Sequence, residues 1–319
     1  MYNVGIDLGG TKIAAGLVDD NCKIIFKNSI PTRAGRPFID IVSDMSVLAL
    51  DVIRRGGASI EQVESIGIGS PGAADRSKGL ILYCSSLNFR DVPLSSEIQK
   101  NIGLPVFLDN DANCAALAES IAGAAKDSEQ SVTVTLGTGI GCGIIIGRKL
   151  YGGFNHAAGE AGHMVIDRDG EQCSCGRKGC WENYASGTAL VRQTRKAAAD
   201  VPLSLINRLS SGDISRIDGK TAFDAARRGD EAAVRVVNQY IRYVSEGLIN
   251  LINILMPEVV VIGGGVSHQG KYFLKPLQQL VSAGVYGGSN LPQPKLKAAE
   301  LGNDAGIIGA AMLKSQASR

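Results

Sequence analysis

The sequence has little of several features that would place it in a special class of proteins. Its net charge is only +2, which is too close to zero to favour nucleic acid or an anionic membrane by bulk attraction. It has 10 prolines and no Gly-X-Y period, which excludes collagen. Hydrophobic residues make up 45% and charged residues 20% of the chain, a balance that excludes global disorder.

The chain also lacks a long apolar run. Its most apolar stretch, residues 248–256, is interrupted by Asn250 and Asn253, whereas a membrane-spanning helix needs about 20 apolar residues. The N-terminus has no basic segment followed by an apolar one, so we do not expect a signal peptide. These absences predict a cytoplasmic protein with no membrane or nucleic-acid partner and no disulfide bonds.

Glycine is present in excess, at 40 of 319 residues, against a usual share of ~7%. The surplus is local, since 27 of the 40 glycines lie in the segments 5–16, 67–72, 137–147, 152–162, 170–187, 263–270 and 302–309. Such clusters are expected where the backbone must approach a ligand closely.

Strands and helices alternate along the chain, which predicts an α/β protein. Residues 3–8 and 13–18 read as an antiparallel pair joined by a glycine turn, and residues 132–136 and 142–146 repeat the pattern. We interpret the repeat as a weak internal duplication that opens two domains. Helices are expected at residues 37–54, 112–125 and 230–256, and a buried strand at 259–262.

Two glycine turns are candidate phosphate sites. In the first, Asp7 ends a strand and is followed by Gly9, Gly10, Thr11 and Lys12, whose backbone and side-chain donors suit an anion. Asp7 would face a Mg²⁺ ion through water. The alternative is a plain hairpin turn whose glycines have positive φ, with Asp7 as its cap.

The second turn is Gly137, Thr138 and Gly139, where Thr138 can donate to a phosphate oxygen. Its alternative is likewise a tight hairpin. Neither turn is a Walker loop, and the Gly-x-Gly-x-x-Gly spacing that ends at Gly72 precedes no helix, so we reject a Rossmann interpretation.

Gly264 and Gly265 follow the buried strand and precede an expected helix. That order suits a flat ligand or a phosphate at a helix N-terminus, or simply close helix packing.

Asn110 and Asp111 lie where a strand is expected to end and a helix to begin. A carboxylate at Asp111 is suited to accept a proton from a hydroxyl group. The alternative is that these residues only cap the helix.

His163 precedes Cys173, Cys175 and Cys180 by a short interval. One imidazole and three thiolates suit tetrahedral zinc with no open position, which indicates a structural metal site. The alternative is a loop of free thiols.

These segments together resemble the ROK family (repressor, open reading frame, kinase) of bacterial sugar kinases over essentially the whole chain. The matching motifs are Asp7–Lys12, Asp109–Asp111, Gly137–Gly141, Glu160–His163, Cys173–Cys180, Glu182–Gly187, Pro257–Gly265 and Leu301–Gly306. The resemblance implies the two-domain actin/hexokinase-like fold with a cleft. The domains would be residues 1–118, completed by 300–319, and residues 119–299 with the zinc loop.

The resemblance also implies a function: transfer of a phosphoryl group from ATP to the 6-hydroxyl of a hexose, with glucose the first expectation. Asp111 would be the base, and the cofactors would be ATP, Mg²⁺ and a structural Zn²⁺. The resemblance also implies a homodimer. The residues expected to hold the sugar are Gly72, Asn110, Asp111, Glu160, His163 and Glu182. The residues expected near the nucleotide are Asp7, Gly9, Gly10, Thr11, Lys12, Gly137, Thr138, Gly139, Gly264 and Gly265.

One position departs from the family pattern, because Ser86 stands where members commonly have Asn. This leaves open a kinase for N-acetylmannosamine or N-acetylglucosamine, and the motifs also leave polyphosphate open as the donor. A sugar-responsive repressor without kinase activity is the alternative from another class. Such repressors carry a helix-turn-helix domain ahead of the kinase-like fold, which we do not expect here because the first turn already begins at Asp7.

Overall fold

The computed structural model describes residues 1–316, which divide into two compact units. The first unit comprises residues 1–133, 143–159 and the chain from residue 300 onward, and the second comprises 134–142 and 160–299. This division differs from the predicted boundary at residue 118, since 119–133 and 143–159 lie in the first unit.

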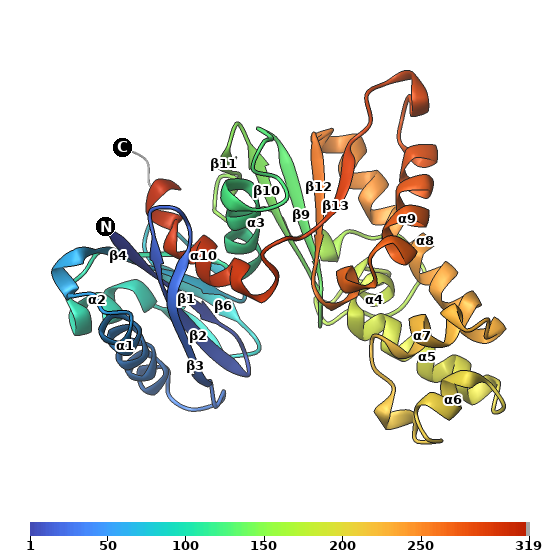
Figure 1. The fold of residues 1–319 in the computed structure, drawn as a ribbon, viewed down its shortest axis with the longest axis horizontal. Helices are drawn as coiled ribbons and strands as arrows, with labels where there is room; N and C mark the ends of the chain where they lie inside the picture. The colour runs from blue at the N-terminus through green and yellow to red at the C-terminus, as the bar shows by residue number, and fades with distance from the viewer. Residues whose placement is uncertain (317–319) are drawn as a thin grey trace. The chain divides into compact units, whose positions relative to one another are not determined.

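A five-stranded sheet in the order β3-β2-β1-β4-β8 is the centre of the first unit (Figure 1). β1 pairs antiparallel with β2 and parallel with β4, and β2 pairs antiparallel with β3. The predicted antiparallel pair at the N-terminus is therefore confirmed and continues into a third strand. The strands are β1 (Tyr2–Leu8), β2 (Lys12–Asp19), β3 (Ile24–Pro31), β4 (Val63–Ser70) and β8 (Val106–Asn110).

Helices cover both faces of this sheet, because side chains along β2 alternate between two apolar clusters. Ile13 and Leu17 lie in one cluster with α1, whereas Ala14 and Val18 pack against α10. The helices of the first unit are α1 (Phe38–Arg55), α2 (Leu94–Ile102), α3 (Asp111–Ala122) and α10 (Ala305–Ala311), with 3-10 turns at Ile60–Gln62, Gly302–Asp304 and Leu313–Gln316.

α10 packs with its backbone directly on the sheet. A Cβ at Gly5 of β1 would lie 1.8 Å from the carbonyl oxygen of Ile307, and one at Gly67 of β4 would lie 1.7 Å from that of Ala310. No side chain fits at either position. The two glycines therefore set how closely the helix approaches the strands.

A small antiparallel sheet in the order β5-β6-β7 follows β4. Its strands are β5 (Ala73–Asp75), β6 (Leu80–Cys84) and β7 (Phe89–Val92). Gly72 lies in the turn before β5 with φ +90°, and a Cβ there would meet the Tyr83 carbonyl at 2.2 Å. No helix follows the glycines of β4, so the rejection of a Rossmann motif is confirmed.

A second five-stranded sheet has the order β11-β10-β9-β12-β13, and the division into units falls within β9 and β10. Its glycine hairpin and crossover strands occupy the same positions as those of the first sheet, which supports an internal duplication. The first strand of the hairpin is close to its predicted bounds, and the second begins two residues early, at Ile140. The strands are β9 (Ser131–Leu136), β10 (Ile140–Ile146), β11 (Lys149–Leu150), β12 (Val259–Gly263) and β13 (Lys295–Ala298).

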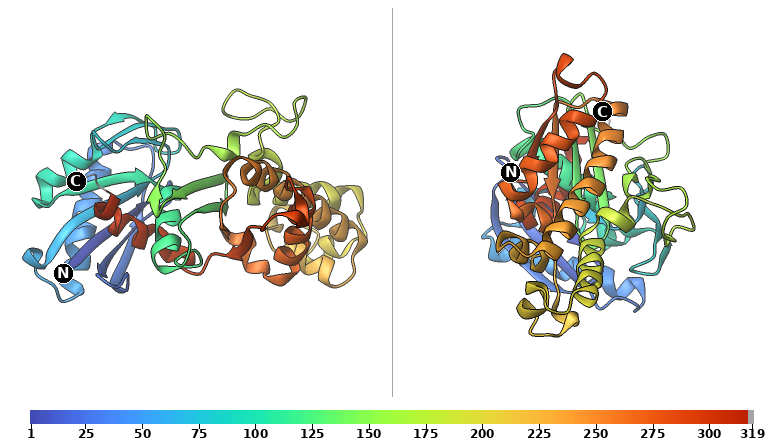
Figure 2. Two further views of the ribbon diagram at one scale, coloured as in Figure 1. Left: turned by 90° about the horizontal axis from the view of Figure 1, so that it is seen from above. Right: turned by 90° about the vertical axis from the view of Figure 1, so that its right-hand side faces the viewer.

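The second unit is mostly helical, and its longest helix, α8, matches the sequence prediction closely. Asp230 caps α8 by accepting the Ala233 N–H at 2.8 Å. Figure 2 (right) shows α8 beside α9, which it contacts. The helices are α4 (Glu182–Ala185), α5 (Gly187–Asp200), α6 (Leu205–Leu209), α7 (Thr221–Arg227), α8 (Glu231–Leu255) and α9 (Lys271–Gly284), with 3-10 turns at Ala161–His163, Ile214–Arg216, Gly265–Gln269 and Gly288–Asn290.

No disulfide bond links any of the seven cysteines, all of which lie within the described residues. Trp181, the one tryptophan, is fully buried in the second unit, where its ring lies against Gly247 of α8. Between residues 1 and 316, no helix is both long and apolar enough to cross a membrane.

Candidate functional site

The turn between β1 and β2 presents free backbone donors. The Gly9 N–H donates to the Lys12 carbonyl at 2.9 Å and closes the turn. The carbonyls of Gly9 and Thr11 are also occupied, by Thr32. Within residues 1–316, the N–H groups of Gly10 and Thr11 have no hydrogen-bond partner. Two unpaired donors in one turn are the arrangement that binds an anion.

The glycines of this turn are not there for backbone conformation. Neither Gly9 nor Gly10 has a positive φ, so the alternative of a hairpin turn that needs positive φ is wrong. A Cβ at Gly10 would meet Ser86 at 3.5 Å, an ordinary contact. Because the fold would accept a side chain at Gly10, its absence leaves room for something outside the chain.

Two carboxyl groups, those of Asp7 and Asp111, lie near this turn. Burial raises the pKa of Asp7 to about 6, the charge of Asp111 raises it further, and Lys12 opposes the rise. Burial also raises the pKa of Asp111, which begins α3. The Asp7 carboxylate accepts no hydrogen bond from residues 1–316. An oxygen ligand beside a second carboxylate suits Mg²⁺, whose charge would offset their repulsion.

The start of α3 is held by its neighbours on both sides. The Asn110 Oδ1 accepts the N–H groups of Ala112 and Asn113 at 2.8 and 3.3 Å. Its Nδ2 donates to the Gly72 carbonyl at 3.1 Å. The structure therefore brings Asn110 and Gly72 together, and the capping alternative holds for Asn110. Asp111 takes part as well, because its Oδ1 accepts the same Ala112 N–H at 2.8 Å.

Two further residues, to which the sequence motifs assign no role, support this helix start. Asp109 is 1% exposed, and its Oδ2 lies 3.1 Å from Arg76 Nε. Its Oδ1 accepts Asn113 Nδ2 at 2.8 Å. Burial raises the pKa of Asp109, and Arg76 opposes the rise. Only Asp109 carries a sequence signal, an acidic residue inside an apolar strand.

The second glycine turn has the same character and lies beside Glu182. The Gly137 N–H donates to the Gly139 carbonyl at 3.0 Å, and a Cβ at Gly137 would meet nothing within 4 Å. In the described chain, the N–H groups of Thr138 and Gly139 have no partner. Glu182 Oε2 accepts the Ile140 N–H at 2.8 Å. One oxygen of the Glu182 carboxylate is therefore already bonded to the end of the turn.

Gly264 and Gly265 differ in what the fold requires of them. Gly264 has φ +82° and leaves no room for a Cβ, whereas a Cβ at Gly265 would meet nothing within 4 Å. The expected helix does not start here, because a 3-10 turn comes first and α9 begins only at Lys271. The helix that starts at these glycines is therefore a short 3-10 helix with Gly264 as its N-cap, rather than the first turn of α9.

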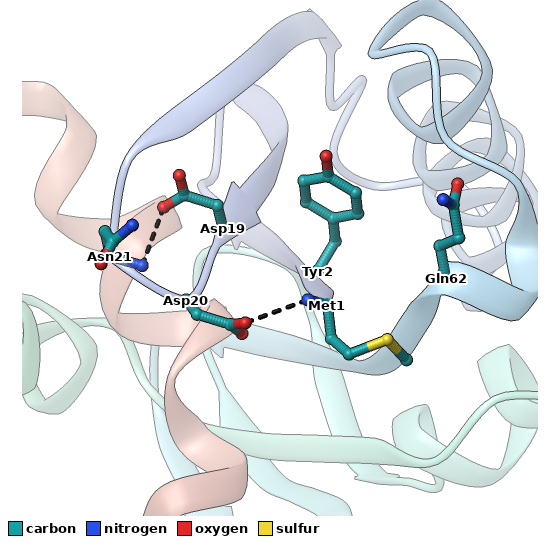
Figure 3. Close-up of a pocket in the computed structure, with 6 residues that line it drawn as sticks. All are labelled: Met1, Tyr2, Asp19, Asp20, Asn21 and Gln62. Atoms are coloured by element: carbon teal, nitrogen blue, oxygen red, sulfur yellow. Dashed lines mark hydrogen bonds and ion pairs between the residues drawn. The ribbon is translucent and has the colours of Figure 1, made fainter.

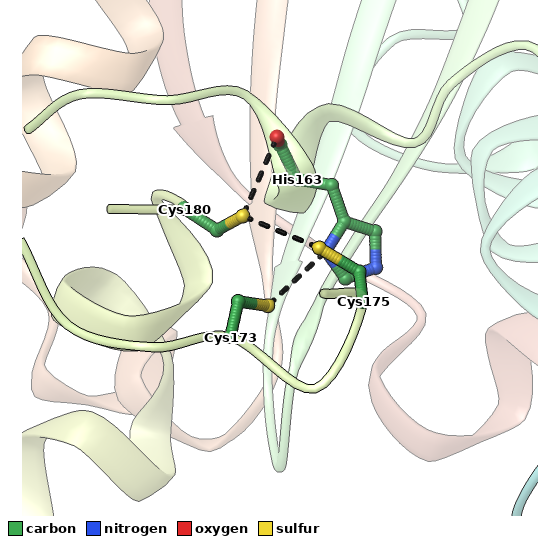
Figure 4. Close-up of side chains that lie close together, drawn as sticks. All are labelled: His163, Cys173, Cys175 and Cys180. Atoms are coloured by element: carbon green, nitrogen blue, oxygen red, sulfur yellow. Dashed lines mark hydrogen bonds between the residues drawn. The ribbon is translucent and has the colours of Figure 1, made fainter. Parts of the chain in front are cut away.

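The four predicted metal ligands come together (Figure 4). Their ligand atoms all lie within 4.8 Å of one another. Cys175 Sγ lies 3.5 Å from Cys180 Sγ, and Cys173 Sγ lies 3.6 Å from His163 Nδ1. Ligands about 2.3 Å from a tetrahedral zinc would be separated by roughly 3.5–4 Å. The four residues therefore fit a closed zinc site.

Glu160 and His163 lie three residues apart around the 3-10 turn Ala161–His163. The His163 N–H donates to the Glu160 carbonyl at 3.0 Å, which closes that turn. Because Nδ1 of His163 faces Cys173, its Nε2 remains for another partner.

A hollow on the first unit contains none of the predicted site residues. Figure 3 shows it lined by Met1, Tyr2, Asp19, Asp20, Asn21 and Gln62. It lies at the start of β1, whereas the Gly9–Lys12 turn follows the end of that seven-residue strand, about 20 Å away at 3.3 Å per residue.

Comparison with known proteins agrees with the motifs. Residues 3–317 match the ROK family. The chain is 36% identical over 312 residues to a glucokinase of Streptomyces coelicolor, covering 97% of this chain and 96% of that one. It is 33% identical over 313 residues to the xylose repressor of Bacillus subtilis, covering 97% of this chain and 75% of that protein.

A solved structure resembles the whole chain. The ROK family glucokinase of Streptomyces griseus, in complex with glucose and AMPPNP, superposes with a TM-score of 0.86 and 36% identity, covering 99% of this chain and 100% of that one. The match over nearly the full length confirms the actin/hexokinase-like fold. This chain is a member of the ROK family.

Proposed function

We propose that the protein is an ATP-dependent glucokinase, which transfers the γ-phosphoryl group of ATP to the 6-hydroxyl of glucose. The observation that carries the proposal is within the first unit, where a turn with two unpaired N–H groups accompanies the partly buried carboxyl of Asp111. The 36% sequence identity to bacterial glucokinases over 97% of the chain supports glucose as the acceptor.

Asp111 would act as the general base. As the sugar O6 bonds to the γ-phosphorus, the bond from phosphorus to the departing ADP oxygen breaks, and the hydroxyl proton passes to Asp111. Its raised pKa brings the proton affinity of the carboxylate closer to what this transfer needs. Asn110 fixes the helix start on which Asp111 stands.

The two glycine turns would bind the phosphates through Gly10, Thr11, Lys12, Thr138 and Gly139, with Gly264 and Gly265 beside the adenosine. Mg²⁺, when bound, would neutralise phosphate charge, and Asp7 would hold it through water.

The sugar would be held by Glu160, Glu182, His163 and the remaining N–H of Asn110, with Gly72 near it. One Glu182 oxygen and His163 Nε2 are the groups left for sugar hydroxyls. A zinc ion on Nδ1 would fix the orientation of that imidazole. A homodimer and a cytoplasmic location remain predictions, and sedimentation velocity checks the first.

An ADP-release assay over a panel of sugars tests the proposal. Glucose is expected to be turned over, and 6-deoxyglucose, which lacks the acceptor hydroxyl, is expected to be inert. Turnover of N-acetylmannosamine or N-acetylglucosamine in preference to glucose would contradict glucose as the substrate. Sugar binding without ADP release would favour a repressor-type role, and polyphosphate replaces ATP in a parallel arm to identify the donor.

A further inference from the structure

The residue after β3, Thr32, directs both of its hydrogen-bond donors to the Gly9–Lys12 turn. Its Oγ1 donates to the Gly9 carbonyl at 2.6 Å, and its N–H donates to the Thr11 carbonyl at 2.9 Å. Thr32 itself is 0% exposed, so its hydroxyl and N–H have no access to water as an alternative acceptor. No sequence motif points to this residue.

Thr32 is itself held from α1. Arg36 donates from Nε and Nη2 to the Thr32 carbonyl at 3.3 and 3.0 Å. The same Nη2 forms an ion pair with Asp44 of α1. An ion pair and hydrogen bonds therefore connect α1 to the turn through Arg36 and the buried Thr32.

The hydroxyl of Thr32 determines where the Gly10 N–H points. The Gly9 carbonyl and the Gly10 N–H belong to one planar peptide and point in opposite directions. When the carbonyl is bonded inward to Thr32, the N–H must face outward. Between two glycines the peptide plane meets little steric resistance to flipping, so the hydrogen bond selects the orientation.

We propose that Thr32 is a positioning residue that holds the Gly9–Gly10 peptide in the orientation that donates to the nucleotide phosphates. The inference rests on the proposed function of the turn as a phosphate site. Without the hydroxyl, the partly buried Gly9 carbonyl loses its donor and turns toward solvent, where its oxygen repels a phosphate.

The test compares Thr32→Val, which keeps the shape and removes the hydroxyl, with Thr32→Ser, which keeps the hydroxyl. Thr32→Val is expected to raise KM for ATP about tenfold, the effect of one partly buried carbonyl left without its donor, and to leave KM for glucose within twofold. Thr32→Ser is expected to restore KM for ATP to within threefold of wild type. Thr194→Val is the matched control, because its buried hydroxyl bonds to the Leu190 carbonyl within α5.

An ATP KM for Thr32→Val equal to that of Thr194→Val would overturn the proposal, as would an equal rise in both KM values or no rescue by serine. Should Thr32→Val not fold, Arg36→Gln takes its place, with an expected two- to fivefold rise in KM for ATP and no change for glucose. If the wild type releases no ADP with any hexose, the proposed function fails separately. Calorimetric titration with Mg·ATP then tests the role of Thr32. Weaker binding of Mg·ATP by Thr32→Val than by the wild type supports that role, and equal binding refutes it.

Discussion

Replacing Asp7 with Asn should stabilise the first unit at neutral pH while it impairs catalysis. Burial raises the pKa of Asp7 to about 6, against about 3.9 in an unfolded chain. A difference of about two pKa units corresponds to at most about 3 kcal/mol of folding free energy. Solvent that reaches the partly exposed carboxyl reduces this figure.

The sign of the effect depends on pH. Native Asp7 binds its proton more tightly than the unfolded chain does, so the stability that this group contributes is present below pH 4 and is lost as the pH rises through 6. Asn has no proton to lose. The free energy of unfolding of Asp7→Asn minus that of wild type should therefore grow between pH 4.5 and pH 7.5, by about 1–3 kcal/mol.

The assay must report on the first unit. Tryptophan fluorescence does not, because Trp181 lies in the second unit. Pulsed hydrogen exchange of peptides from β1 and β4 during urea unfolding, without Mg²⁺, follows the unfolding of the first unit. Asp127→Asn, an exposed carboxylate in the same unit, is the control. A variant no more stable than wild type at pH 7.5, or an equal difference at both pH values, would refute the reasoning.

Three further results are expected. Asp111→Asn should lower kcat by about 10²–10⁴-fold with the fold intact, and the acid limb of the wild-type pH profile should lie above the usual Asp range because burial raises the pKa of Asp111; unchanged turnover would exclude it as the base. Elemental analysis should find about one zinc per chain, and Cys173→Ser should lose the metal and lower Tm, whereas a metal-free wild type would exclude the zinc site. Gly67→Ala should lower the free energy of unfolding by roughly 3 kcal/mol or more, since its Cβ would lie 1.7 Å from the Ala310 carbonyl oxygen. Gly219→Ala, where a Cβ meets nothing within 4 Å, should leave the free energy of unfolding almost unchanged.

The sequence predicts those parts of the molecule that are formed by residues close together in the chain. The cap at Asp230 and the apolar spacing of α8 are readable because a helix repeats every 3.6 residues. The cluster around His163 is readable because four strong metal ligands at short spacing have few other uses.

Features that join distant segments are not readable in the same way. α10 is built of small and branched residues with no clear polar face, and its position depends on Gly5 and Gly67. Thr32 bonds to the turn across 23 residues of sequence, and a threonine after a strand carries no local sign of such a contact. The order of Gly264 and Gly265 after a buried strand predicts a helix start but not its type, and a short 3-10 helix satisfies the same order.

The position of α10 has a consequence for the newly made chain. Strand β8 ends at residue 110 and α10 begins at 305, and a ribosome adds roughly 5–20 residues per second. About 10–40 s therefore pass between synthesis of the last strand of the central sheet and synthesis of the helix that covers one of its faces. During that interval Ala14 and Val18 of β2 have no helix to pack against. The first unit can therefore complete its fold only after residues 305–311 have been made, and until then the uncovered apolar face is prone to aggregate.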